Sequence, residues 1–171
     1  MLDGAVKNML LTVSGMQVGG LSYSKGDGIF ASRLEICFIG LTETLAIDVE
    51  CAFRVLDGQA LLLTNADAWI DTSGRWLSER RLKQKGITDT YLSAALQAIN
   101  ERVSNTRVSA ISVQPYGDID IRLQNGIDIQ IINDTAMDYD TLYTIIQQGE
   151  HMRRFTVYCR ADDILSEEIP D

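Results

Sequence analysis

Proline, histidine and long apolar runs are scarce in this chain, and each shortage excludes a class of structure. The 171 residues include only two prolines, Pro115 and Pro170, so no proline-rich linker divides the chain. No apolar run reaches the ~20 residues that a membrane-spanning helix needs. No basic region precedes the short apolar run near residue 10, so a signal peptide is not expected. We therefore expect one domain over residues 1–171, located in the cytoplasm.

Groups that carry chemistry are also few. The three cysteines, Cys37, Cys51 and Cys159, are an odd number without C-x-x-C spacing, and each lies in an apolar, strand-like setting. We expect buried, reduced thiols. His151 is the only histidine, so any catalytic triad would depend on it, and no metalloprotease, calcium-loop or phosphate-loop motif is present. We predict no catalytic residue, no metal site and no cofactor.

Basic residues are outnumbered: 15 Lys and Arg stand against 24 Asp and Glu, which gives a net charge of -9. This balance argues against binding nucleic acid through a broad basic surface, and no membrane partner is expected either. It fits attraction toward a basic protein partner. The one basic cluster, at 75–85, is interpreted as a solvated connection whose aliphatic stems rest on the core.

The clearest pattern lies at 117–133, where aliphatic and polar residues alternate and predict two half-buried strands. A three-residue turn at 124–126 places Ile121 opposite Ile129, so both aliphatic rows face the same side. Gly126 would take the left-handed conformation of that turn at little cost.

The longest alternation, at 45–55, predicts a second strand of the same kind, followed by an aliphatic run at 60–63. The same argument about faces predicts a three-residue turn at 56–58. That turn would place Phe53 opposite Leu61.

The two hairpins share a motif, R-[VL]-x-[DN]-G, at 54–58 and 122–126. The motif indicates either a duplication, with pseudo-repeats at 30–66 and 107–133, or convergence on a common turn. The intervening residues, 67–106, form a connection and a helix. The predicted fold class is therefore α+β: two antiparallel β-meanders with one main helix between them.

The helix is expected at 88–103, where apolar residues recur at helical spacing. A strand is expected at 9–13 and turns at the glycines of 15–28. Residues 141–148 fit either a short helix or a strand. A closing strand with an inward-facing Cys159 is expected at 153–159.

The last residues, 161–171, are acidic and are expected to be loose.

Carboxylate pairs are the strongest candidates for a site. Residues i and i+2 share one face of a strand, so Asp48 with Glu50, and Asp118 with Asp120, could each act together. These faces are predicted to be exposed, which favours binding over catalysis. The candidate binding residues are Asp48, Glu50, Asp118, Asp120 and Asp128.

The segment I-D-V-E-C-A-F-R at 47–54, the later N-A-D at 65–67 and the segment at 117–129 resemble an uncharacterised bacterial β-rich domain family. Its members carry I-x-[VI]-x-C-x-W-R and G-D-L-x-[LI]…N-G segments, and here Phe53 replaces the tryptophan and Ile119 the leucine. The resemblance covers about half of the chain and implies a β-rich, non-catalytic domain. The chain also resembles bacterial toxin-immunity proteins in its size, its acidic charge and its lack of catalytic motifs.

These observations lead to a hypothesis with open alternatives. The chain is expected to be a non-catalytic cytosolic binding protein, an immunity protein that neutralises a bacterial toxin by binding its basic domain. The alternatives are a small-ligand-binding protein or enzyme that uses a carboxylate pair, and a subunit that forms a homodimer through strand edges.

Overall fold

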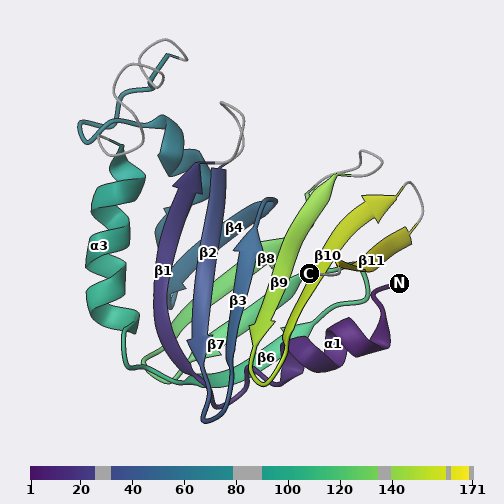
Figure 1. Cartoon of the computed structure of the whole chain (residues 1–171). Helices are drawn as coiled ribbons and strands as arrows, with labels where there is room; N and C mark the ends of the chain where they lie inside the picture. The colour runs from purple at the N-terminus through teal and green to yellow at the C-terminus, as the bar shows by residue number, and fades with distance from the viewer. Residues whose placement is uncertain (26–31, 79–89, 135–139, 161–162, 170–171) are drawn as a thin grey trace.

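The computed structural model describes residues 1–25, 32–78, 90–134, 140–160 and 163–169, and shows two antiparallel β-sheets packed face to face (Figure 1). Sheet A has the strand order β1-β2-β3-β9-β10-β11, and sheet B has the order β5-β4-β8-β7-β6. The α+β class is therefore confirmed, in a form dominated by β-structure.

The strands of sheet A are β1 (Gln17–Lys25), β2 (Ser32–Ile39), β3 (Thr44–Val49), β9 (Thr141–Gln148), β10 (Met152–Arg160) and β11 (Asp163–Ile169). The strands of sheet B are β4 (Ala52–Asp57), β5 (Ala60–Thr64), β6 (Val108–Val113), β7 (Ile119–Leu123) and β8 (Ile127–Ile132). The described helices are α1 (Gly4–Leu11), the 3-10 helix η1 (Asn65–Trp69) and α3 (Tyr91–Val103).

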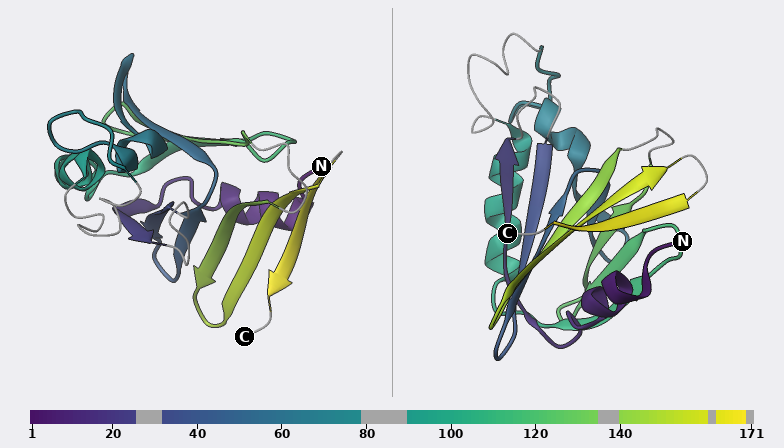
Figure 2. Two further views of the ribbon diagram at one scale, coloured as in Figure 1. Left: turned by 90° about the horizontal axis from the view of Figure 1, so that it is seen from above. Right: turned by 45° about the vertical axis from the view of Figure 1, so that its right-hand side comes forward.

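The two α-helices among the described residues lie at opposite ends of the sandwich. Helix α3 packs against the edge strands β1 and β5, whereas α1 packs against β6 and lies between the sheets at the other end (Figure 2, left). Neither helix covers the outer face of a sheet. Both outer faces are therefore available to carry polar side chains.

The core is built from the aliphatic rows that the alternation predicts. In β3 the side chains of Leu45, Ile47 and Val49 are fully buried, and in β7 Ile119 and Ile121 are buried in the same interior. The inward orientation of both predicted rows is therefore confirmed.

The long alternating segment at 45–55 forms strands in both sheets, β3 in sheet A and β4 in sheet B. The chain bends at Glu50–Cys51, leaves sheet A and enters sheet B as β4. The Leu142 carbonyl accepts hydrogen bonds from the backbone N–H groups of both Glu50 (2.9 Å) and Cys51 (3.1 Å), which fixes this corner. Because the two inner faces oppose each other, the same face of the segment stays inward across the corner.

The central hairpin has the predicted register. Ile121 lies opposite Ile129 in the β7–β8 pair, and the Gly126 N–H donates to the Leu123 carbonyl at 3.1 Å. Gly126 has a φ of 86°, so the left-handed conformation expected at this position is present.

The register predicted for the other hairpin is wrong. Val55, and not Phe53, pairs with the inward-facing aliphatic row of β5, through Leu63. The chain turns through Gly58–Gln59, and a bulge between Val55 and Leu56 restores the inward facing of Val55. The turn was predicted at 56–58, so its actual position moves the pairing by three residues and the bulge moves it by one more.

The two R-[VL]-x-[DN]-G turns lie at the same end of sheet B. Asp57 accepts a hydrogen bond from the Arg102 guanidinium at 2.7 Å, and the Asn125 amide donates to the Arg102 carbonyl at 2.8 Å. Both turns therefore contact one residue of α3. The segment 30–66 is divided between the two sheets, whereas 107–133 forms the continuous β6-β7-β8 meander of sheet B.

The prediction of a strand at 9–13 is wrong, because residues 4–11 form α1. Its buried side chains, Val6, Met9 and Leu10, have helical spacing. The Asp3 carboxylate accepts hydrogen bonds from the N–H groups of residues 5 and 6 and caps the helix.

Two further predictions are corrected at the edges of sheet A. Gly19 and Gly20 do not form a turn but lie inside β1, next to a bulge between Val18 and Gly20. Residues 163–169 are not loose but form β11, which pairs with β10.

The sequence also predicted features of β9, β10 and α3. Residues 141–148 form a strand, and β10 buries Cys159 as predicted. The helix is confirmed over 91–103, while residues 79–89 lie outside the described residues.

Asn100 of α3 fixes the edge strand β1 to the helix. Its amide oxygen accepts a hydrogen bond from the Leu21 N–H, and its amide nitrogen donates to the Leu21 carbonyl, both at 2.7 Å. One side chain thus satisfies both backbone groups of an edge residue, as a neighbouring strand would.

We expect Asn100→Asp to lower the free energy of unfolding by about 1–3 kcal/mol. The carboxylate keeps the acceptor but has no donor, so the Leu21 carbonyl loses its partner and faces a negative charge. Urea denaturation measures the effect. The control is Gln97→Glu, the same change at an exposed position of α3, and equal losses in both variants would contradict the assignment.

Candidate functional site

The structure divides the predicted binding residues between the two sheets. Asp118, Asp120 and Asp128 belong to sheet B or its loops, whereas Asp48 belongs to β3 of sheet A and Glu50 directly follows it. The five acids therefore do not form one site.

Asp120 and Asp128 lie on the outer face of sheet B in a partly open depression of about 400 Å³. Asp128 forms an ion pair with Arg122 at 2.9 Å. Asp120 accepts hydrogen bonds from the Gln130 amide at 3.1 Å and from the Ser112 hydroxyl at 3.4 Å. The depression is a cross-strand network of polar groups on an uncovered face, suited to contact with another polar surface.

Asp118 has a structural role. Its carboxylate accepts a hydrogen bond from the Asn133 N–H at 2.7 Å, and the Asn133 amide donates to the Tyr116 carbonyl at 3.0 Å. These bonds join the start of β7 to the end of β8. Asp118 is therefore outside the depression that holds Asp120.

Asp48 and Glu50 share a cation that the sequence analysis missed. Arg33 of β2 contacts Asp48 at 3.5 Å and Glu50 at 3.2 Å. This ion pair could not be predicted from the sequence alone. It depends on the pairing of β2 with β3, which brings residues 33 and 50 near each other.

The prediction that Asp48 and Glu50 are exposed is corrected, because their side chains are only 19% and 23% exposed. Burial raises the pKa of both carboxyls, and the Arg33 guanidinium offsets part of this rise. Asp48 Oδ1 and Arg33 Nε are buried without a hydrogen-bond partner among the described residues. The cluster is an ion-pair network held partly out of water, and Asp128, which is 25% exposed beside Arg122, is buried to a similar degree.

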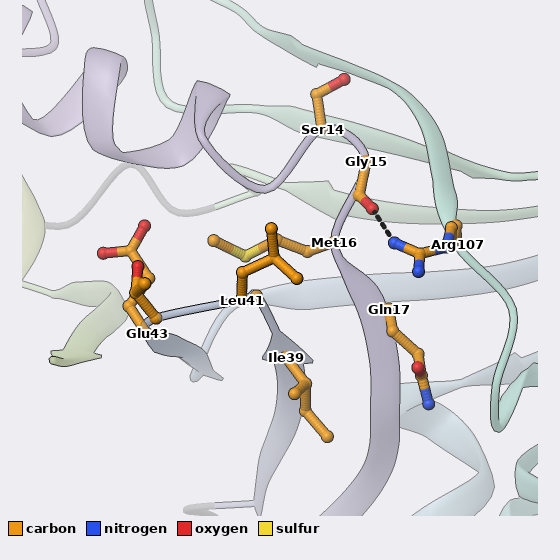
Figure 3. A pocket seen from close by; sticks show the side chains of 10 residues that line it. Ser14, Gly15, Met16, Gln17, Ile39, Leu41, Glu43 and Arg107 are labelled. Carbon is orange, nitrogen blue, oxygen red and sulfur yellow. Dashed lines mark hydrogen bonds between the residues drawn. The ribbon is translucent and has the colours of Figure 1, made fainter.

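A second concave site lies at the end of sheet A, where the β2–β3 hairpin meets the start of β1. It has a volume of about 380 Å³ (Figure 3). Met16 and Ile39 line its apolar part, beside the fully exposed Leu41. Arg107 donates to the Gly15 carbonyl at 2.9 Å on one side, and Glu43 lies on the other. The pocket has a mixed lining, with no nucleophile positioned beside a base.

The cysteines are free thiols, as expected, although Cys37 and Cys51 are only partly buried. Burial raises the pKa of the Cys51 thiol to about 12, so at neutral pH it is protonated and a poor nucleophile. Burial also raises the pKa of the neighbouring Tyr143 hydroxyl, which has no hydrogen-bond partner among the described residues. Gly117 packs against this tyrosine and against Leu142.

His151 is exposed in the turn between β9 and β10. Within the described ranges, no group of three or more His, Cys, Asp or Glu side chains is arranged to hold a metal ion. None of the described helices is long and apolar enough to cross a membrane. Of the basic cluster at 75–85, the described Arg75 forms an ion pair with Asp71 at 3.2 Å, and residues 79–85 lie outside the described residues.

Comparison with known proteins finds no matching family model, no matching curated protein and no matching solved structure. The resemblances proposed from the sequence therefore stay predictions.

The raised pKa of the Asp48 carboxyl predicts that the stability of the fold depends on pH. An acid whose pKa is higher in the folded chain binds more protons when folded, so its contribution to stability falls as pH rises above about 4. Asp48→Asn removes this titration. We expect the stability of the variant relative to the native chain to increase with pH through the range just above 4.

Urea denaturation at several pH values between about 3.5 and 7 measures this difference. Glu101→Gln, at an exposed position of α3, controls for removal of a carboxylate in general. If the relative stability of Asp48→Asn decreased with pH, the attraction of Arg33 would outweigh the cost of burial.

Gly117 provides a test of packing near Tyr143. Its φ is 91°, and a Cβ there would lie 3.2 Å from Leu142 Cδ1. Gly126 has a similar φ of 86° but open space around it. We expect Gly126→Ala to cost about 1 kcal/mol of stability from backbone strain, and Gly117→Ala roughly 1–2 kcal/mol more from crowding. Equal costs by urea denaturation would contradict the close packing.

Proposed function

We propose that this protein is a non-catalytic, cytosolic protein-binding domain that presents the outer face of sheet B to a basic partner. The observation that carries the proposal is the partly open depression in which Asp120 and Asp128 lie on neighbouring strands, with neither α1 nor α3 over them. The most specific form of the proposal is an immunity protein, which neutralises a bacterial toxin by occupying its basic surface.

The electrostatics of the chain support a basic partner. The net charge is -9, and a charge of this size speeds association with a positively charged surface. In the depression, Arg122 neutralises one of the two acids, so the local pattern is mixed and not uniformly negative. A partner with lysine or arginine beside an acceptor group would match this pattern.

The predicted binding surface is therefore narrower than the sequence suggested. Arg33 pairs with both Asp48 and Glu50, and Asp118 joins two strands. On sheet B, Arg122 pairs with Asp128 and leaves Asp120 without an ion pair among the described residues. Of the five acids, we assign only Asp120 and Asp128 to contact with the partner.

An enzymatic role is the second candidate, and the surroundings of the carboxylates favour it less. A carboxylate pair that transfers protons needs an enclosed substrate site, whereas the depression of sheet B is partly open. The pKa values of Asp48 and Glu50 are raised by burial, but both carboxylates form ion pairs with the side chain of Arg33 on the neighbouring strand.

We also propose that the two R-[VL]-x-[DN]-G hairpins derive from one ancestral hairpin. Their equivalent turn residues, Asp57 and Asn125, both contact Arg102, which supports a shared origin. Convergence on a turn that fits the end of α3 would produce the same contacts.

The binding proposal is tested by reversing the charge of the depression. The assay partner is a basic toxin domain, which the proposal expects a neighbouring gene to encode, and it is expressed with the native chain or with the double variant Asp120→Lys, Asp128→Lys. The native chain should restore growth of cells that produce the toxin. The double variant should bind the toxin roughly tenfold or more weakly in calorimetry, because two attractive contacts become repulsive.

The matched control is Glu101→Lys, Glu150→Lys, which changes the net charge equally at exposed positions elsewhere. Thermal unfolding of all variants separates loss of binding from loss of fold. If the native chain neither bound nor protected, the immunity proposal would be lost. If both double variants lost binding equally, the loss would result from the change in net charge and not from the outer face of sheet B.

A further inference from the structure

A sandwich of two open sheets has four edge strands, and in this protein other elements cover three of them. At β1, the Asn100 amide binds Leu21 and the Val18 N–H donates to the Thr106 carbonyl at 2.8 Å. At β6, Val108 exchanges backbone hydrogen bonds with Gly15 and Met16. The third edge, β5, has only five residues and packs against α3.

The fourth edge, β11, is different. Its seven residues, Asp163–Ile169, pair with β10 on one side along the whole strand. In the part of the chain that the structure describes, β11 pairs with no strand other than β10, and the N-terminal ammonium of Met1 forms an ion pair with Asp163 at the start of β11. Figure 2 shows this strand at the outer margin of sheet A, away from α3. Alternate N–H and C=O groups along such an edge point outward and can bind a further strand.

We infer that the β11 edge binds an extended segment of a basic partner protein, which adds to sheet A as a seventh strand. Backbone hydrogen bonds would supply the pairing, and side chains next to the edge would select the partner. The side chains of Glu167 and Glu168 are exposed on this outermost strand. They are therefore the first charges that an added strand meets.

The charges around β11 favour lysine or arginine in that strand. Arg153 pairs with Glu168 at 3.1 Å, and Arg154 lies opposite Ile169, but both arginines belong to β10, one strand further from the edge. Glu167 has Thr156 as its cross-strand neighbour and no ion pair among the described residues. Opposite charges directly across two strands stabilise the pairing, whereas like charges weaken it.

A second copy of the chain fits this edge less well. Pairing of β11 with β11 would bring two molecules of net charge -9 together and place four glutamates around one short ladder. Charged side chains on an edge strand commonly prevent such self-association. The same charges would attract a basic segment.

This inference uses a surface that is separate from the depression on sheet B. It rests on the proposed binding role only in the sense that a protein is the ligand. The Asp120→Lys, Asp128→Lys variant should therefore leave binding at the β11 edge unchanged except for its effect on net charge.

The test uses a synthetic ten-residue peptide of alternating lysine and valine, with blocked ends, and the intact, isotope-labelled protein. On addition of the peptide, amide exchange should slow at alternate residues of β11, because every second N–H points outward. A peptide of alternating glutamate and valine, the charge-reversed probe, should leave these amides unchanged.

A variant with Glu167→Lys and Glu168→Lys should bind the lysine peptide roughly tenfold more weakly than the Glu101→Lys, Glu150→Lys control of equal net charge. Equal affinities, or amide protection centred on Asp120 and Asp128, would overturn the inference. So would light scattering that shows a dimer of the native chain that the Glu167 and Glu168 substitutions disrupt, because the occupant would then be a second copy. If the peptide did not bind at all, the inference would also be lost, whatever the outcome of the toxin experiment.

Discussion

The corner at Glu50–Cys51 is the constraint on which the rest of the structure depends. There the chain passes from sheet A to sheet B within two residues, and the Leu142 carbonyl holds both backbone N–H groups. The aliphatic row of 45–55 continues through the corner without a change of phase. Because the inner faces of the sheets oppose each other, one uninterrupted row fills the interior on both sides of the bend.

This arrangement decides where polar groups can be placed. With the interior filled by aliphatic side chains, the alternate positions of each strand lie on an outer face. On sheet B the result is an open polar network around Asp120 and Asp128. On sheet A the same alternation brings Asp48 beside Glu50 and under Arg33, where burial raises the pKa of both carboxyls. Two carboxylate pairs with the same spacing therefore acquire different properties from their neighbours.

The helices complete the sandwich at its ends and not on its faces. Helix α3 joins the two sheets through Asn100 at β1 and through Arg102 at both hairpin turns. At the other end, α1 contacts β6, and the segment that follows it pairs with Val108. This division of roles leaves the outer faces and the β11 edge as the surfaces open to another molecule. The proposals for function and for strand addition both follow from that exposure.

The sequence by itself determined the direction of the side chains and the local shape of the central hairpin. Alternation is a property of neighbouring residues, so it predicted the inward rows at 45–55 and 119–131 and the register around Gly126. Apolar residues at helical spacing predicted a helix at 88–103, which is confirmed over 91–103, and capping by Asp3 with the spacing of Val6 and Met9 could have predicted α1 as well.

Only the tertiary structure decided which sheet each strand joins, because backbone hydrogen bonds between distant strands leave no periodic signal in the sequence. The bulge that changes the register of β4 with β5 is one example. The pairing of Arg33 with Asp48 and Glu50 is another, since it depends on β2 lying beside β3. The site could be predicted as a set of carboxylates, but whether each one is open to a partner depends on contacts between strands.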